Sequence, residues 1–163
     1  MKEEWRNIVV DGKVYEKYSV SNLGRVISHL KKNKEKILKP RKSRHRVSGH
    51  RVTLLFPKGF FNDYEYHCSP KEKLSRRDRG VHQLVMETFF PIDKNPPAAV
   101  SAKEWKKTPE SVKQIVRECI IINHKDHNPA NNRLDNLEYV TPRQNSRKAV
   151  EHYRKLVGKN LTE

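Results

Sequence analysis

Residues 119–145 read CIIINHKDHNPANNRLDNLEYVTPRQN, and this stretch decides the fold of the C-terminal part of the chain. The apolar run 119–122 predicts a short buried strand that ends at Asn123-His124. Residues 127–136 are rich in Asn and Asp, as in a loop, and residues 137–140 alternate like a second strand. We therefore predict a hairpin with polar side chains at the end of its first strand.

A helix start follows the second strand directly. Thr141 suits the N-cap, Pro142 suits the first helical position, and Gln144 stands three residues after the cap, as a capping box requires. A helix that begins there places Asn145 in its first turn, with its side chain leaning back toward the strand end that carries His124. Strand, strand and helix are therefore predicted to converge on one point.

This arrangement resembles the HNH nuclease motif with its ββα-metal fold. The resemblance covers residues 119–149 and is carried by Asn123-His124, Asp126, Asn131-Asn132, the run from Asn136 to Thr141, and Asn145. Residues 5–28, which include YSVSNLGRV at 18–26, resemble the small module that precedes HNH domains in phage and intron homing endonucleases. Residues 81–85 resemble the helix between the two modules.

The resemblance implies a role for each polar residue of the motif. His124 would be the general base, Asn136 would pin the loop and orient the histidine, and Asn123 and Asn145 would hold one divalent cation against the scissile phosphate. Mg²⁺ is the expected cation, with Mn²⁺ as the alternative. Many relatives have Asp where this chain has Asn123. An amide oxygen binds a hard cation more weakly than a carboxylate does, so we expect lower metal affinity or a broader choice of metal.

The expected chemistry suits these residue types. A neutral imidazole can take a proton from water at physiological pH. A cation held by amide oxygens, phosphate oxygens and waters offsets charge on the transition state and on the leaving 3′ oxygen. The resulting hydrolysis of the phosphodiester leaves 5′-phosphate and 3′-hydroxyl ends.

The charge balance indicates a nucleic-acid partner. The 163 residues carry a formal net charge of +16, and only 34% of them are hydrophobic. A chain with this charge binds a polyanion that releases counterions, so we expect double-stranded DNA as the partner. No stretch approaches the roughly 20 apolar residues of a membrane span, and no helix pairs a basic face with a broad apolar face. We therefore expect no membrane association; the sequence indicates no protein partner and leaves a homodimer open.

The basic residues are concentrated between residues 25 and 58, where twelve Lys or Arg accompany a single acid, Glu35. Such a run favours phosphate contacts, which position a protein on DNA, whereas hairpin and strand side chains favour base readout. Two arginines of the final helix are expected to grip phosphates beside the cut. The predicted DNA-binding residues are Asn22, Arg25, Lys39, Arg41, Arg46, His50, Arg51, Arg143 and Arg147.

These patterns predict an α+β fold in three parts. Residues 1–60 form an N-terminal antiparallel β module that binds DNA, and residues 61–118 form a helical connector with an insertion. Residues 119–163 form the ββα-metal motif and the C-terminal helix. Apolar residues of that last helix, Ala149, Tyr153, Leu156 and Val157, make a stripe that we interpret as core or dimer contact.

Weaker patterns predict the remaining elements. In chain order they are a β-hairpin over 15–27, a loop over the lysine run 31–36, a strand over 51–56, a short strand and then a loop over 60–79, a helix over 81–90, a linker over 92–108, and a short helix capped at Thr108 that runs to about Glu118.

Two other interpretations of the His and Cys residues were weighed. His82 lies among apolar neighbours on a predicted helix, which favours a packed, hydrogen-bonded histidine over a role near the active site. A zinc site built from His67, Cys68, Cys119 and His127 is disfavoured because the short ligand pairs of structural zinc sites are missing. Both cysteines are therefore interpreted as reduced packing thiols.

We predict a metal-dependent, site-specific DNA endonuclease of the HNH type, with a homing role implied by the N-terminal resemblance. The start of the chain has no apolar signal-peptide core, so we expect a soluble, cytoplasmic protein of a bacterium or of a phage-infected cell. The alternatives are a restriction-type or repair nuclease with a short site, and a DNA-binding protein whose HNH site is vestigial.

Overall fold

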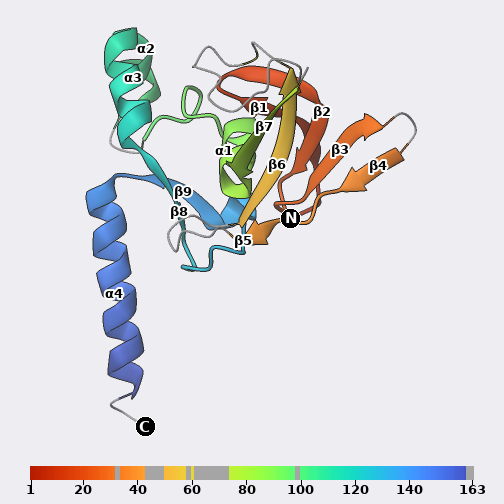
Figure 1. Cartoon of the computed structure of the whole chain (residues 1–163). Coiled ribbons are helices and arrows are strands. Elements are labelled where there is room, and N and C mark those ends of the chain that lie inside the picture. The colour runs from red at the N-terminus through yellow and green to blue at the C-terminus, as the bar shows by residue number, and fades with distance from the viewer. Residues whose placement is uncertain (32–33, 43–49, 58–59, 61–73, 98–99, 161–163) are drawn as a thin grey trace.

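The first sheet is an antiparallel ribbon in the order β1-β2-β3-β4. Its strands are β1 (Trp5–Val10), β2 (Lys13–Ser21), β3 (Val26–Lys31) and β4 (Lys34–Ile37). The computed structural model describes residues 1–31, 34–42, 50–57, 60, 74–97 and 100–160 (Figure 1). The predicted hairpin over 15–27 is confirmed by the pairing of β2 with β3. The lysine run, which we predicted as a loop, contains the fully exposed strand β4 instead.

The second sheet has the order β5-β6-β7. Its strands are β5 (Arg41–Lys42), β6 (His50–Pro57) and β7 (Leu74–Gly80), and all its pairs are antiparallel. The predicted strand over 51–56 is confirmed. The loop predicted up to Arg79 is wrong over residues 74–79, because β7 pairs along its whole length with β6. The short strand predicted after residue 60 lies outside the described residues. This sheet joins the predicted N-terminal module to the predicted connector.

A hydrophobic core among the described residues joins both sheets to α1 (Val81–Phe89). The predicted helix over 81–90 is confirmed, and it buries Val81, Leu84, Val85 and Met86. The core is completed by residues from β1, β2, β3, β6 and the later strand β9 (Leu137–Val140), namely Ile8, Val10, Tyr18, Val20, Val26, Val52, Leu54, Phe56 and Leu137.

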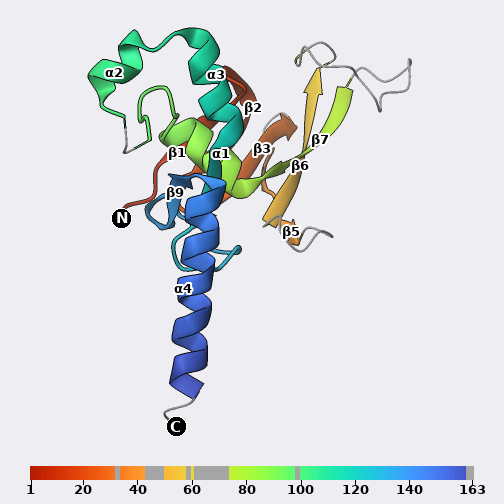
Figure 2. The same ribbon diagram turned by 90° about the vertical axis from the view of Figure 1, so that its left-hand side faces the viewer.

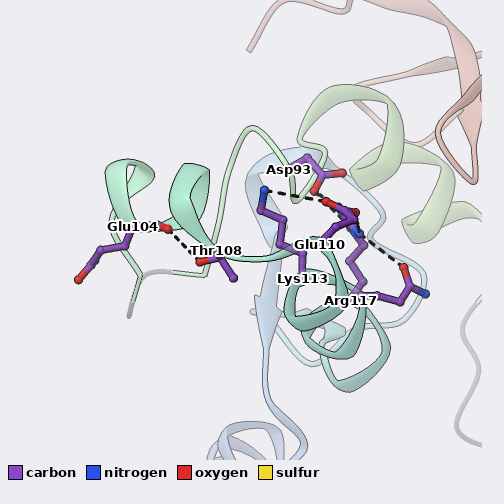
Figure 3. A network of polar contacts seen from close by, with 7 residues as sticks. Asp93, Glu104, Thr108, Glu110, Lys113 and Arg117 are labelled. Atoms are coloured by element: carbon purple, nitrogen blue, oxygen red, sulfur yellow. Dashed lines mark hydrogen bonds and ion pairs between the residues drawn. The ribbon is translucent and has the colours of Figure 1, made fainter.

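Two short helices, α2 (Ala102–Lys107) and α3 (Glu110–Cys119), form an appendage beside this core. Residues 102–107 lie in the predicted linker, so that prediction is corrected: Ser101 and Glu104 form a capping box that starts α2. Arg117 binds Asp93 and Glu110 and so ties α3 to the chain that follows α1 (Figure 3). Trp105 is buried, and the Lys113 ammonium lies over its ring.

The C-terminal part is a two-stranded sheet followed by one long helix. Its elements are β8 (Ile121–His124), the short 3₁₀ helix η1 (Leu134–Asn136), β9 (Leu137–Val140) and α4 (Pro142–Asn160). The predicted α+β class is confirmed. The predicted cap is also present, since Gln144 accepts from the Thr141 backbone and the Thr141 hydroxyl accepts from the Gln144 backbone.

Two details of this C-terminal part differ from the predictions. The first strand begins at Ile121 rather than at Cys119, and it is partly exposed because only one strand pairs with it. Helix α4 extends away from the two larger sheets (Figures 1 and 2). Its apolar stripe is therefore not core: Tyr153 is 67% exposed and Leu156 is 50% exposed.

The turn between β2 and β3 packs against the loop between β8 and β9. The Leu134 backbone N–H donates to the Asn22 carbonyl at 2.8 Å. Gly24 has a φ of +80°, and a Cβ built there would lie 2.8 Å from the Asn132 Cβ and 2.9 Å from its carbonyl oxygen. Glycine is needed here both for the backbone conformation and for the close approach.

This contact leads to a matched pair of glycine substitutions. Gly12 also has a positive φ, of +76°, but open space surrounds its Cβ position. We expect Gly12→Ala to lower the free energy of unfolding by about 1–2 kcal/mol through backbone strain alone. Gly24→Ala should cost at least about 1 kcal/mol more because it also overpacks against Asn132. Urea unfolding measures both values, and equal losses would contradict the importance of the contact.

A buried carboxylic acid on α1 makes stability depend on pH. Burial raises the pKa of Glu87 to about 7, with a further rise from Asp11 that Arg79 opposes. The folded protein therefore holds a proton that the unfolded chain releases near pH 4.5. The stabilisation is complete below pH 4.5 and is lost as pH rises through about 7.

We expect Glu87→Gln to remove this pH dependence. Between pH 5 and pH 8, the free energy of unfolding of the wild type should fall relative to the variant, by up to about 3 kcal/mol. Urea titrations of both proteins at the two pH values measure the difference, because other titrating groups cancel. Parallel pH profiles would show that Glu87 is not held protonated.

Candidate active site

The β8–β9 hairpin places the predicted active-site residues at one end. In its register Asn123 pairs with Glu138 and His124 pairs with Leu137. The loop between the strands is closed by Asn136, whose amide donates to the Asp126 carboxylate at 2.9 Å and to the Asn131 carbonyl at 2.8 Å. The same amide accepts from the Asp126 backbone. Asn136 thus holds the loop.

The hydrogen bond to His124 comes from Asn132, not from Asn136. His124 Nε2 lies 3.1 Å from Asn132 Oδ1. The Asn132 amide nitrogen donates to the Ala130 carbonyl, so its oxygen faces the ring as an acceptor. Nε2 therefore carries the hydrogen, and Nδ1 is the nitrogen left to take a proton. We correct the predicted orienting residue from Asn136 to Asn132, which the motif includes but whose contact its spacing does not reveal.

His82 packs against the same ring from α1. The two ring centroids are 5.4 Å apart in an edge-on arrangement. Burial lowers the pKa of His82 to about 4, with His124 and Arg51 as further causes, so His82 is neutral near pH 7. The ring is packed as predicted, but its buried Nδ1 has no hydrogen-bond partner among the described residues. The prediction of a satisfied histidine is therefore wrong for that atom.

Asn123 is buried at the end of β8, and its amide nitrogen donates to Glu138 Oε1 at 2.8 Å. Lys148 of α4 donates to the same oxygen at 2.7 Å. Asn145 lies one turn before Lys148 on the half-buried face of α4 and so turns toward the hairpin. Farther along that face, His152 stacks on His127 with ring centroids 4.1 Å apart.

The amide groups fit a hard divalent cation. The Asn123 side chain contacts Glu138 through Nδ2, and no described residue donates a hydrogen bond to Asn123 Oδ1. Among the described residues, no three His, Cys, Asp or Glu side chains form a metal-binding group. The candidate ligands are therefore the amide oxygens of Asn123 and Asn145, which suit Mg²⁺ or Mn²⁺ when phosphate and water complete the coordination.

Comparisons with known proteins agree with this geometry. The NUMOD4 motif matches residues 3–53, and the HNH endonuclease model matches residues 79–147. Residues 79–147 are thus similar to the HNH endonuclease family. An uncharacterized HNH endonuclease of Acanthamoeba polyphaga mimivirus is 29% identical over 150 residues, which are 92% of this chain and 27% of that protein.

A solved structure titled for DNA binding and cleavage by the HNH homing endonuclease I-HmuI is also similar. It matches with a TM-score of 0.54 and 25% identity, and the match covers 91% of this chain and 59% of that one. The chain thus spans about a quarter of the length of the viral relative and about three fifths of the solved one.

Two predicted DNA-binding residues of the NUMOD4 region are used inside the protein. Asn22 is buried, accepts from the Glu4 backbone and donates to the Lys2 carbonyl. We therefore correct Asn22 from base readout to a structural role in the turn. Arg25 forms an ion pair with Glu3 and lies over the Trp5 ring.

The second sheet presents a basic face. Arg51 and Thr53 alternate with buried residues, so they share the outer face with Asp78 and Arg76 of β7. Arg41 donates to Asp78 at 2.7 Å, and Arg51 donates to the Asp78 carbonyl at 2.8 Å. Arg76 also lies on this face, although it is not among the residues predicted from the sequence to bind DNA. The SRRDR run at 75–79 is the signal that could have pointed to it.

The remaining predicted contacts are spread over the surface. His50 Nδ1 lies 3.2 Å from the Pro129 carbonyl oxygen, which belongs to the loop between β8 and β9. Lys39, Arg143 and Arg147 are exposed. Arg46, like His67 and Cys68 of the disfavoured zinc site, lies outside the described residues, whereas Cys119 is exposed.

The contact between Asn132 and His124 generates a rate prediction. Asn132→Ala should lower the single-turnover rate of DNA cleavage at least about tenfold, since a base contributes about 10²–10⁴-fold only when correctly placed. DNA affinity measured in chelator should not change. Asn128→Ala is the control, because Asn128 lies in the same loop and its side chain bonds only the Ala130 backbone among the described residues. Equal losses in both variants would contradict an orienting role for Asn132.

Proposed function

We propose that this protein is a metal-dependent DNA endonuclease in which His124 is the general base. The observation that carries the proposal is the state of His124 within an HNH match: Nε2 is bound by Asn132 and Nδ1 is left to accept a proton. Asn123, the residue before His124 on β8, has an amide oxygen that accepts no hydrogen bond from the described residues. A base next to a cation site is what phosphodiester hydrolysis requires.

In the proposed reaction, a water molecule gives a proton to His124 Nδ1 and its oxygen forms a bond to phosphorus. The bond from phosphorus to the 3′ oxygen breaks, and the leaving 3′ oxygen takes a proton from solvent water. The products therefore carry 5′-phosphate and 3′-hydroxyl ends, and His124 later returns its proton to solvent. When bound by Asn123 and Asn145, Mg²⁺ or Mn²⁺ would offset the negative charge that develops on the phosphate and on the leaving oxygen. Asn136 keeps the loop closed and Asn132 keeps the imidazole in place.

Double-stranded DNA is the proposed substrate and partner. The net charge of +16 supports it, as do the basic outer face of the second sheet and the exposed arginines Arg143 and Arg147 at the start of α4. We assign Lys39, Arg41, Arg51, Arg76 and these two arginines to DNA contact.

A nuclease works where its DNA is, which for a phage-infected bacterium is the cytoplasm. None of the described helices could cross a membrane.

A homing role, with cleavage at a long specific site, is the form of this function that we favour. It is supported by the NUMOD4 match and by the similarity to an HNH homing endonuclease over 91% of the chain. A restriction-type or repair nuclease with a short site remains the alternative. Cleavage of a random-sequence DNA library separates the two by the number of base pairs shared among the cut sites.

The proposed chemistry is tested by plasmid cleavage with Mg²⁺, with Mn²⁺ and with chelator. We expect wild-type protein to convert supercoiled plasmid to nicked or linear DNA only when metal is present. His124→Ala should lose at least about 10²-fold in rate while DNA binding is retained. His29→Ala is the matched control, since His29 lies on β3 and contacts Ser19 rather than the β8–β9 hairpin.

A wild-type protein that binds DNA but cuts in neither metal would contradict the enzyme and favour a DNA-binding protein with a vestigial site. Cleavage that persists in His124→Ala would instead contradict the assignment of the base.

A further inference from the structure

Glu138 lies directly across the hairpin from Asn123. The two residues are register partners in β8 and β9, and the Asn123 amide nitrogen donates to Glu138 Oε1 at 2.8 Å. Asn123 is 8% exposed, and the Glu138 side chain is 24% exposed. Among the described residues, Glu138 is the only hydrogen-bond partner of the Asn123 side chain.

The contact fixes which end of the Asn123 amide faces the candidate metal position. An asparagine amide can present either its oxygen or its nitrogen to a given side, and only the oxygen is a ligand for a hard cation. A carboxylate only accepts hydrogen bonds, so Glu138 selects the nitrogen for its own side. The oxygen is thereby left for the other side.

Lys148 holds the carboxylate that makes this selection. Its ammonium donates to the same Oε1 atom at 2.7 Å, from the face of α4 that also carries Asn145. The chain of contacts therefore runs from α4 through β9 to β8. It links α4, which carries the proposed ligand Asn145, to the side chain of the other proposed ligand, Asn123.

We propose that Glu138 is a positioning residue that makes the amide of Asn123 a metal ligand. The inference rests on the proposed function, in which Asn123 binds the cation. Glu138 does this by accepting the amide hydrogen, and its carboxylate places a negative charge directly behind the neutral ligand. Groups that orient a metal ligand in this way commonly change metal affinity about 10–100-fold.

The pairing has a chemical consequence that distinguishes it from a simple charge effect. The Asn123→Asp variant has no side-chain hydrogen to donate, so its carboxylate would face Glu138 as a second carboxylate. A further Glu138→Gln substitution would relieve this clash, because the glutamine amide nitrogen can donate to the new carboxylate. Substitution of Glu138 should therefore have opposite effects on metal binding in the wild-type and Asn123→Asp backgrounds.

The experiment compares wild type, Glu138→Gln, Asn123→Asp and the double variant Asn123→Asp/Glu138→Gln. Mn²⁺ alone is titrated into each full-length protein without DNA, and electron paramagnetic resonance measures the free ion. We expect Glu138→Gln to weaken Mn²⁺ binding about tenfold in the wild-type background and to tighten it about tenfold in the Asn123→Asp background. The Mn²⁺ concentration for half-maximal plasmid cleavage should accordingly rise on Glu138→Gln substitution in the wild-type background and fall in the Asn123→Asp background.

Glu16→Gln is the control, since Glu16 is an exposed residue of β2 and its substitution changes the net charge equally. It should leave both readouts unchanged. Circular dichroism during thermal unfolding shows whether each variant is folded. A loss in both backgrounds would indicate a structural or purely electrostatic role and would overturn the inference.

Unchanged Mn²⁺ dependence in both readouts would overturn it as well. These outcomes leave the endonuclease itself standing as long as the wild type cuts DNA with metal. A wild type that neither binds Mn²⁺ nor cuts DNA would overturn the proposed function instead.

Discussion

The packing of the β2–β3 turn against the β8–β9 loop is the constraint on which the candidate site depends. The bond from the Leu134 N–H to the Asn22 carbonyl and the close approach of Gly24 to Asn132 fix the loop from outside. Asn132 in turn holds the ring of His124. The proposed base is thus positioned by the first sheet as well as by its own hairpin, because the regions matched by the two family models contact each other here.

The hairpin has little stability of its own, because two short strands bury few apolar side chains. It is supported from three directions. The N-terminal turn packs on its loop, α1 places His82 against His124, and α4 reaches it through Lys148. Each of these three contacts involves a residue close to the proposed active site. Small shifts of the first sheet, α1 or α4 would therefore change the geometry of the site. This arrangement suits the proposed metal site, whose neutral amide ligands would coordinate a cation more weakly than carboxylates and would therefore need well-fixed geometry.

Local signals predicted the parts of the fold that local physics determines. The capping box of Thr141 and Gln144, the apolar spacing of 81–90 and the turn at 21–24 each specify one element, and all three are present. Predictions failed where tertiary contacts decide. Asn22 has the chemistry of a base reader but is buried in the turn, β7 is an arginine-rich strand because β6 pairs with it, and the motif spacing cannot distinguish Asn132 from Asn136 as the partner of His124.

The exposed far half of α4 has an evolutionary consequence. Residues 153–158 are exposed, and the helix contacts the hairpin through its first turns and through His152. Substitutions along that half therefore have little effect on folding. They can change with the sequence or surface that the helix contacts. The hairpin and the first sheet must instead change together, because Gly24 and Asn132 leave no space between them. Among relatives of this chain, we therefore expect the far half of α4 to vary more in sequence than the region around His124.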